Sequence, residues 1–216
     1  MFAVVFEVEP KPDRWDDYLA VAGTLRPELL GIEGFLDNIR YRSRRRPGWV
    51  LSLSLWENEA GLARWRAHAG HRLAQDRGRS EIFQGYRLRV GRIVGAAAEA
   101  PTGRGLVSLI DPGLLPPAPP DSPPAEIARG LGLAETADGL EAWDVFEALL
   151  TPGAFLLVLS WRDAAAAGAG ITAIPAGGGH RLVATARDYG MFARAEAPGH
   201  QGSQGHQGNQ GPRSEG

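Results

Sequence analysis

Two tryptophans and two histidines gather in the stretch from Trp56 to His71. Trp56 ends an alternating segment, and Trp65, His68 and His71 follow it at helical spacing. Histidine is the side chain whose unperturbed pKa, about 6.5, lies nearest to neutral pH. Either imidazole is therefore suited to moving a proton, and the indoles are suited to forming an apolar wall around it.

The same four residues also have purely structural interpretations. Trp56 and Trp65 stand at the spacing of core residues, and His68 fits a solvent-exposed position on a helix. His68 and His71 are three residues apart and share a helix face, but no nearby Asp or Glu completes a set of metal ligands. We therefore expect no metal site.

The segment from Gly48 to His71 predicts a strand that runs directly into a helix. Its first part, VLSLSLW, alternates leucine with serine, as the period of two in a strand requires. Asn58 stands at the expected N-cap of the helix, where its side chain accepts a hydrogen bond from a free amide. Glu59 then suits the positive end of the helix dipole.

The surrounding elements predict a split-βαβ unit of the order βαββαβ. Pro27 indicates that the last turn of the first helix is bent or separate. The other predicted elements are a strand from Phe2 to Val8, a helix from Asp13 to Leu29, and strands over Phe35–Arg42 and Tyr86–Val94.

The turn SRRRPG places three consecutive arginines, Arg44, Arg45 and Arg46, between the second and third strands. Pro47 and Gly48 predict a hairpin turn there. We interpret the arginines as a solvated loop tip, with an anion-binding patch as the alternative.

The second half of the chain repeats the first in a reduced form. The segment GAFLLVLSWRD (153–163) aligns with GWVLSLSLWEN (48–58), so that Trp161 corresponds to Trp56. Further matches are strands over 106–110, 143–150 and 187–197, a short helix over 125–133 and a stunted alanine helix over 164–169. We predict an α+β fold with two ferredoxin-like domains, 1–97 and 104–197, and a disordered Gly/Gln-rich tail, 198–216.

Composition gives little sign of nucleic-acid or membrane binding. The 23 Lys and Arg residues nearly balance the 25 Asp and Glu residues, and no apolar run reaches the length of a membrane span. The chain has no cysteine, and its first residues lack a basic leader, so we expect a cytoplasmic protein. We interpret His200 and His206 as parts of a solvated tail rather than as metal ligands.

The segments EGFLDNIRY, VLSLSLWENEAGLARWRAHAGHRLAQDRGR and YRLRV resemble the antibiotic biosynthesis monooxygenase (ABM) family of dimeric α+β barrels. RDYGMFARAEAP is similar to the closing segment of the same family. The resemblance implies that two ferredoxin-like units pair as an internal dimeric α/β-barrel with a ligand pocket under the helices.

Some members of this family oxidise phenols, anthrones or quinols with dioxygen and use no metal, haem or flavin. Such chemistry needs a base to form the substrate anion and a dry pocket around it. The resemblance implies catalytic roles for His71, Trp65 and Asn38. It implies that substrate is bound by Trp56, His68, Arg72 and Tyr86, with Asn38, Arg72 or Tyr86 donating to the developing oxyanion.

Two other functions remain open. One is a non-catalytic protein that binds a small apolar ligand or serves in a stress response. The other is haem degradation, for which Trp65 and His71 match at a shortened spacing, whereas Phe6 and Glu7 stand where an Asn belongs.

We expect the catalytic cavity to lie in the first half, with the second half contributing wall and no chemistry. A tethered second unit covers the apolar sheet face of the first at high effective concentration. The chain is therefore expected to be a monomer with an internal pseudo-dimer, with further homodimer formation possible but not required.

Overall fold

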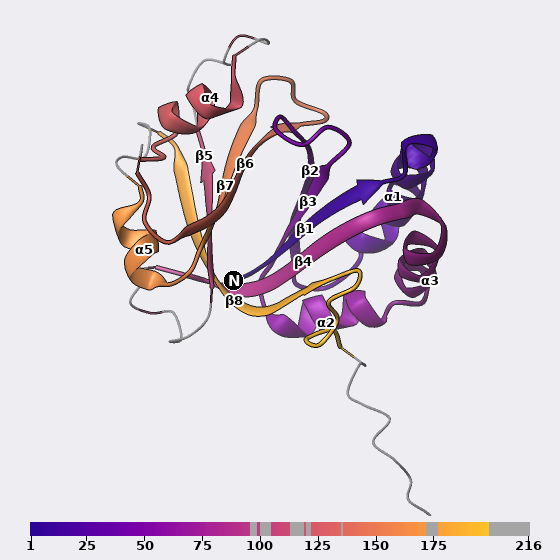
Figure 1. Cartoon of the computed structure of the whole chain (residues 1–216). Coiled ribbons are helices and arrows are strands. Elements are labelled where there is room, and N and C mark those ends of the chain that lie inside the picture. The colour runs from indigo at the N-terminus through magenta and orange to yellow at the C-terminus, as the bar shows by residue number, and fades with distance from the viewer. Residues whose placement is uncertain are drawn as a thin grey trace, which may run out of the picture.

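The computed structural model describes residues 1–95, 99, 105–112, 119, 122–134, 136–171 and 177–198. Within them, eight antiparallel strands close into a barrel in the order β1-β3-β2-β6-β7-β5-β8-β4 (Figure 1). The strands are β1 (Phe2–Pro10), β2 (Phe35–Ser43), β3 (Val50–Trp56), β4 (Phe83–Val94), β5 (Leu106–Asp111), β6 (Leu140–Ala148), β7 (Phe155–Trp161) and β8 (Gly179–Gly190). None of the described helices is both long and apolar enough to span a membrane.

The helices are distributed unequally between two sides of the barrel. They are α1 (Trp15–Leu30), α2 (Glu59–Ala67), α3 (Ala69–Arg77), α4 (Pro124–Gly130) and α5 (Ala164–Ala169), with a 3-10 turn at Pro12–Arg14 and a π-helical turn at Gly78–Ile82. In Figure 1, α1, α2 and α3 lie on one side and the short α4 and α5 lie on the opposite side. The predicted α+β barrel of two ferredoxin-like units is confirmed.

The two halves repeat each other in strand register. Trp56 at the end of β3 pairs with Phe2, and Trp161 at the end of β7 pairs with Leu106. The glycines that need positive φ also recur, since Gly48 and Gly153 precede the two tryptophan strands with φ of 82° and 81°. The internal repeat predicted from the sequence is therefore present in the backbone.

The first strand, β1, is covered on both faces. Ala3 and Val5 point into the barrel, where they share one apolar cluster with Leu109 and Val158 of the second half. The alternate residue Val4 packs on the opposite face, under the helices. The barrel interior is thus a core common to both halves, which confirms the two-sided burial expected of β1.

The two halves meet along two seams of different length. At the longer seam β4 pairs with β8 from Arg87 to Val94. A Cβ on Gly91 would lie 2.3 Å from the Ala184 carbonyl oxygen, so glycine permits this close approach. At the shorter seam, β2 pairs with β6 over three residues, from Tyr41 to Ser43.

The three arginines of the β2–β3 turn reinforce the shorter seam. Arg44 forms an ion pair with Glu147 at 3.1 Å, and Arg46 pairs with Asp144 at 2.7 Å and with Glu7. Arg45 stacks over the Trp143 ring, 3.8 Å from its centroid. The interpretation as a solvated loop tip was wrong, because the carboxylates of β6 lie directly opposite the turn.

Three details differ from the sequence prediction. The second helix breaks at His68, whose ψ of 131° is extended, so that α2 and α3 are separate. Pro27 lies inside α1, which continues to Leu30. The closing strand β8 spans Gly179–Gly190 rather than 187–197. It lies earlier in the chain because its first part, Gly179–Ala184, pairs with β5 and its remainder pairs with β4 up to Gly190.

The predicted domain boundaries remain predictions. Positions 97 and 104 and the tail from 199 onward lie outside the described residues.

Candidate active site

A cavity of about 540 Å³ lies between the first half of the barrel and its helices. Its floor is the outer face of β1 to β4, and α1, α2 and α3 form its roof. Apolar side chains such as Val4, Phe6 and Leu88 alternate along the floor with polar ones. Six of the seven predicted site residues line this cavity: Asn38, Trp56, Trp65, His71, Arg72 and Tyr86.

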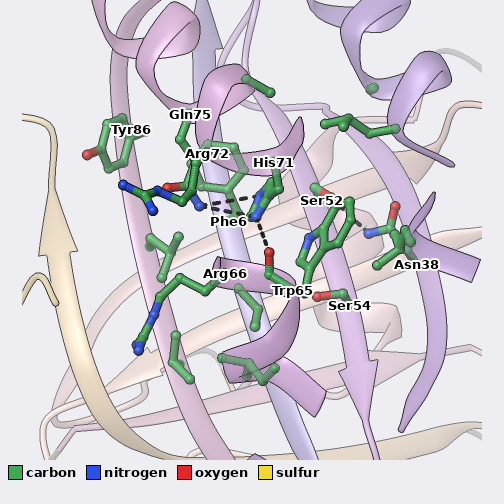
Figure 2. Close-up of a pocket in the computed structure, with 18 of the residues that line it drawn as sticks. Phe6, Asn38, Ser52, Ser54, Trp65, Arg66, His71, Arg72, Gln75 and Tyr86 are labelled. Carbon is green, nitrogen blue, oxygen red and sulfur yellow. Dashed lines mark hydrogen bonds between the residues drawn. The ribbon is translucent and has the colours of Figure 1, made fainter. Parts of the chain in front are cut away.

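His71 is the titratable group at the centre of the site. Its Nδ1 lies 2.9 Å from the Trp65 carbonyl oxygen, which can only accept a hydrogen bond (Figure 2). Nδ1 therefore carries the proton in the neutral ring, and Nε2 is the basic nitrogen. The Gln75 amide nitrogen lies 3.2 Å from Nδ1 and 3.5 Å from Nε2, and of these two atoms only the unprotonated Nε2 can accept from it. The imidazole also stacks on the Trp65 indole at 4.4 Å.

The break between α2 and α3 creates this arrangement. In a continuous helix the Trp65 carbonyl would accept a hydrogen bond from the amide of residue 69. The extended His68 interrupts that ladder, and the carbonyl accepts from the His68 amide at 3.2 Å and from the His71 ring. Gly70 of α3 faces Glu28 of α1, whose carboxylate oxygen would lie 2.5 Å from a Cβ at that position.

Burial lowers the pKa of His71 to about 4. The hydrogen bond to Trp65 raises the pKa and the nearby His68 lowers it, but burial dominates. His71 is therefore neutral at pH 7, and its Nε2 can accept a proton. Its protonation becomes favourable when a negative charge forms beside it, and the stacked indole face also favours the cation.

The amide of Asn38 is oriented by its neighbours on β3. Its Nδ2 donates to Ser52 Oγ at 2.9 Å and to the Leu53 carbonyl at 3.1 Å. The remaining atom, Oδ1, is buried without a hydrogen-bond partner among the described residues. Asn38 thus offers an acceptor to the cavity, whereas the family resemblance implied a donor to the developing oxyanion.

Arg40 is a cavity residue that the sequence analysis did not select. Its Nε is buried without a hydrogen-bond partner in the described part of the chain. Its positive charge also acts on Tyr18, whose pKa is nevertheless raised because burial outweighs that charge. The alternation of β2 was the available signal, since Asn38 and Arg40 must share a strand face.

The other predicted residues occupy distinct parts of the site. Trp56 packs at the floor, where its indole N–H donates to Ser54 at 2.9 Å. Tyr86 accepts a hydrogen bond from Arg194 at 2.7 Å, which leaves its own hydroxyl proton available. Arg72 lies at the cavity edge and is exposed.

His68 is the predicted site residue that lies outside the cavity lining. Its Nδ1 is 3.3 Å from Glu28 Oε2 on α1, and its ring stacks on Trp65 at 5.5 Å. His68 therefore supports the roof rather than facing the enclosed space.

The geometry gives little support to the haem and metal alternatives. Phe6 faces the cavity and Glu7 is buried in an ion pair with Arg89, so β1 offers no amide to the site. Within the described residues, no group of three His, Asp or Glu side chains is placed to hold a metal ion.

Comparison with known proteins identifies the family. Residues 1–77 match the family model described as "Antibiotic biosynthesis monooxygenase". A Pyricularia oryzae protein named "Jasmonate monooxygenase ABM" is 39% identical over 220 residues, which cover 92% of this chain and 97% of the relative. The chain belongs to the antibiotic biosynthesis monooxygenase family. The match extends through both halves, so the relative shares the double-unit architecture of this family member.

Shorter and more distant similarities were also found. The "Uncharacterized protein YqjZ" of Bacillus subtilis is 28% identical over 68 residues, 32% of this chain and 53% of the relative. A solved structure of a conserved protein from Methanosarcina mazei covers 42% of this chain and 90% of its own, with 21% identity and a TM-score of 0.40. An anthrone oxidase-like protein covers 91% and 95%, with 16% identity and a TM-score of 0.36.

Proposed function

We propose that this chain is a cofactor-independent monooxygenase whose base is His71. The observation that carries the proposal is a neutral, partly buried imidazole whose Nε2 is left unprotonated in a mainly apolar cavity. A buried base with a shifted pKa in a pocket is typical of a catalytic site, and it favours an enzyme over a passive binder of apolar ligands.

The proposed reaction converts a CH₂ group that is acidified by a conjugated carbonyl, as in an anthrone, into a second carbonyl. His71 Nε2 removes one C–H proton, and the resulting carbanion supplies electrons to dioxygen as a new C–O bond forms. His71 returns this proton to the peroxide anion, which gives a hydroperoxide. It then removes the second C–H proton while the O–O bond breaks, and gives that proton to the departing hydroxide, so that the ketone and water form. One CH₂ and one O₂ yield one C=O and one H₂O, so the substrate is the only reductant.

The cavity contains groups suited to the charge that develops during this reaction. When His71 takes the proton, an imidazolium and a substrate oxyanion form together and stabilise each other. Arg40 Nε and the Tyr86 hydroxyl are the proposed donors to that oxyanion. Asn38 Oδ1 is the proposed acceptor for a substrate hydroxyl.

The name of the Pyricularia relative adds jasmonate to the substrates that merit a test. We propose two candidate classes: phenolic, anthrone or quinol-type aromatics, and jasmonate-like cyclic ketones. Both present an acidic hydrogen near an oxygen atom, which is the feature that a buried base can use.

Oxygen uptake tests the proposal. Purified protein is incubated aerobically with an anthrone, a set of hydroquinones and jasmonate, without added metal, flavin or reductant. We expect uptake above the buffer rate with at least one compound, and a loss of about 100-fold or more in His71→Ala. His180→Ala, which alters an exposed histidine of the second half, is the matched control and keeps its activity. Uptake at the buffer rate for every compound would favour the non-catalytic ligand-binding protein.

A further inference from the structure

The described charged residues that line the cavity are all of one sign. Among the described lining residues none is an Asp or a Glu, whereas seven are arginines: Arg26, Arg40, Arg66, Arg72, Arg79, Arg187 and Arg194. This bias is local, because acidic residues slightly outnumber basic ones in the whole chain. A cavity with a mostly apolar floor and a positive rim favours a ligand that carries negative charge.

Three of these arginines converge at one end of the cavity from three separate segments. Arg66 comes from α2, Arg187 from β8, and Arg194 from the segment that follows β8. All three charges act on the Tyr189 hydroxyl, whose pKa is nevertheless raised because burial dominates. Arg66, Arg187 and Arg194 are hereafter called the arginine cluster.

The positive charge of the cluster is weakly compensated within the described part of the protein. Arg66 makes no ion pair with a described residue, and Arg187 reaches the exposed Glu59 at 3.5 Å. Arg194 donates to the neutral Tyr86 hydroxyl. All three side chains are partly buried, and partly buried cations near one another are stabilised by a shared anion.

We propose that the arginine cluster binds a carboxylate of the substrate and thereby places the reacting carbon at His71. This inference rests on the proposed function, because it assigns the substrate class of the same cavity. In Figure 2, Arg66 and Tyr86 lie on one side of His71, and Asn38 and Ser52 lie on the other. The ligand is thus a cyclic carboxylic acid whose body spans the apolar floor, with its oxygen-bearing ring toward β2.

The proposal changes the role of the second half. Arg187, Tyr189 and Arg194 all follow residue 178, and they reach across the β4–β8 seam to the cavity of the first half. The expectation that the second half contributes wall and no chemistry therefore understates it. Under this proposal the second half recognises the substrate and the first half acts on it.

Equilibrium titrations without oxygen test the proposal apart from any turnover. The probes are two pairs of an acid and its ester: jasmonate with methyl jasmonate, and 2-naphthoate with methyl 2-naphthoate. Quenching of the fluorescence of the cavity tryptophans measures their binding. We expect at least one acid to bind about tenfold or more tightly than its ester, because guanidinium–carboxylate bonds are charge-assisted. If neither acid binds more tightly than its ester, the proposal is wrong.

Substitutions locate the carboxylate site. Arg66→Gln, Arg187→Gln and Arg194→Gln should each weaken acid binding about five- to tenfold and leave ester binding unchanged. Arg194→Lys should recover part of the loss because it keeps the charge. Arg129→Gln, at an exposed position on α4, is the matched control. A preference for acids that survives in all three variants and disappears in Arg40→Gln would contradict the assignment to the cluster.

The two proposals can fail separately. His71→Ala should retain the preference for the acid while losing oxygen uptake. If the wild-type protein prefers acids but consumes no oxygen, the carboxylate site is supported and the proposed reaction is contradicted.

Discussion

The two halves of the barrel share one strand scaffold but differ on the face under the helices. In the first half, Arg40 lies opposite Ser52 in the β2–β3 ladder, and this face lines the cavity. At the same positions of the second half, Val145 lies opposite Leu157, and both are fully buried. Strand pairing therefore determines the fold that both halves share, whereas the residues on one strand face determine whether that face borders a cavity or a packed core.

The helices follow the same division. The first half covers its sheet with the 16-residue α1 and the pair α2 and α3, which stand far enough from the floor to leave a cavity. The second half has the 7-residue α4 and the 6-residue α5. Alanines and Gly170 lie close to the Trp161 ring there, where a Cβ on Gly170 would be 2.0 Å away.

The largest expected effect comes from breaking an ion pair that occurs in both halves. Glu7 and Arg89 pair in the buried barrel wall, and Asp111 and Arg181 pair at the equivalent, more exposed place. Glu7→Ala leaves Arg89 buried without its carboxylate and should cost about 4 kcal/mol of unfolding free energy. Asp111→Ala should cost about 1 kcal/mol or less. Urea unfolding measures both, and equal losses would contradict the difference in burial.

A swap of equivalent residues tests the contrast between cavity and core. Leu157→Ser opens a hole in a packed core and buries a hydroxyl, so we expect a loss of about 3 kcal/mol. Ser52→Leu places the second-half residue in the cavity, where Asn38 keeps its bond to the Leu53 carbonyl. Stability should then change by less than about 1 kcal/mol, while ligand binding falls about tenfold or more.

Unfolding and titration of both variants, measured side by side, check this prediction. If Ser52→Leu binds ligand as well as the wild type does, Ser52 does not border the functional cavity.

The pH dependence of stability should differ between the histidines of the two halves. Because the folded pKa of His71 is about 4 and its unfolded value is about 6.5, its contribution is complete above pH 6.5 and is lost as pH falls toward 4. The stability difference between the wild type and His71→Gln should therefore fall by about 2 kcal/mol from pH 7 to pH 5. Partial desolvation also lowers the pKa of His180, but its side chain is more exposed than that of His71, so His180→Gln should show a smaller change.

Unfolding curves at several pH values measure these differences. A difference between the wild type and His71→Gln that does not vary with pH would show that His71 is not protected from protonation.

The smallest expected effect concerns the two equivalent helix caps. Asn58 accepts a hydrogen bond from the Gly61 amide, and Asp163 accepts one from the Ala166 amide, both at 2.9 Å. Each alanine substitution should cost about 1 kcal/mol. Asn58→Ala should also weaken ligand binding, because α2 carries Trp65, whereas Asp163→Ala should not. Thermal unfolding with a parallel ligand titration distinguishes the two.

The sequence predicted those features that depend on local patterns. Alternation predicted β1 and β3, a short polar side chain predicted the cap at Asn58, and the repeated tryptophan segment predicted the second unit. The resemblance to a family then placed His71, Trp65 and Asn38 in one predicted site, and all three residues line one cavity.

The features that were missed depend on contacts between distant segments. The break at His68 arises where α3 approaches α1 at Gly70, which a helical pattern does not reveal. The role of Arg46 depends on carboxylates about 100 residues later in the chain. The arginine cluster likewise forms only when β8 pairs with β4, so Arg66 and Arg187 are not recognisable as neighbours in the sequence.

A nitrogen-15 NMR titration of the histidine-labelled protein tests the central claim most directly, because it reports the tautomer and the pKa of His71. The account predicts the Nδ1–H tautomer, a pKa of about 4, and a shift of the His71 signals, but not of the His180 signals, when a cavity ligand is added. An Nε2–H tautomer, or a pKa near 6.5, would contradict the claim that the first half holds a buried base with a free Nε2.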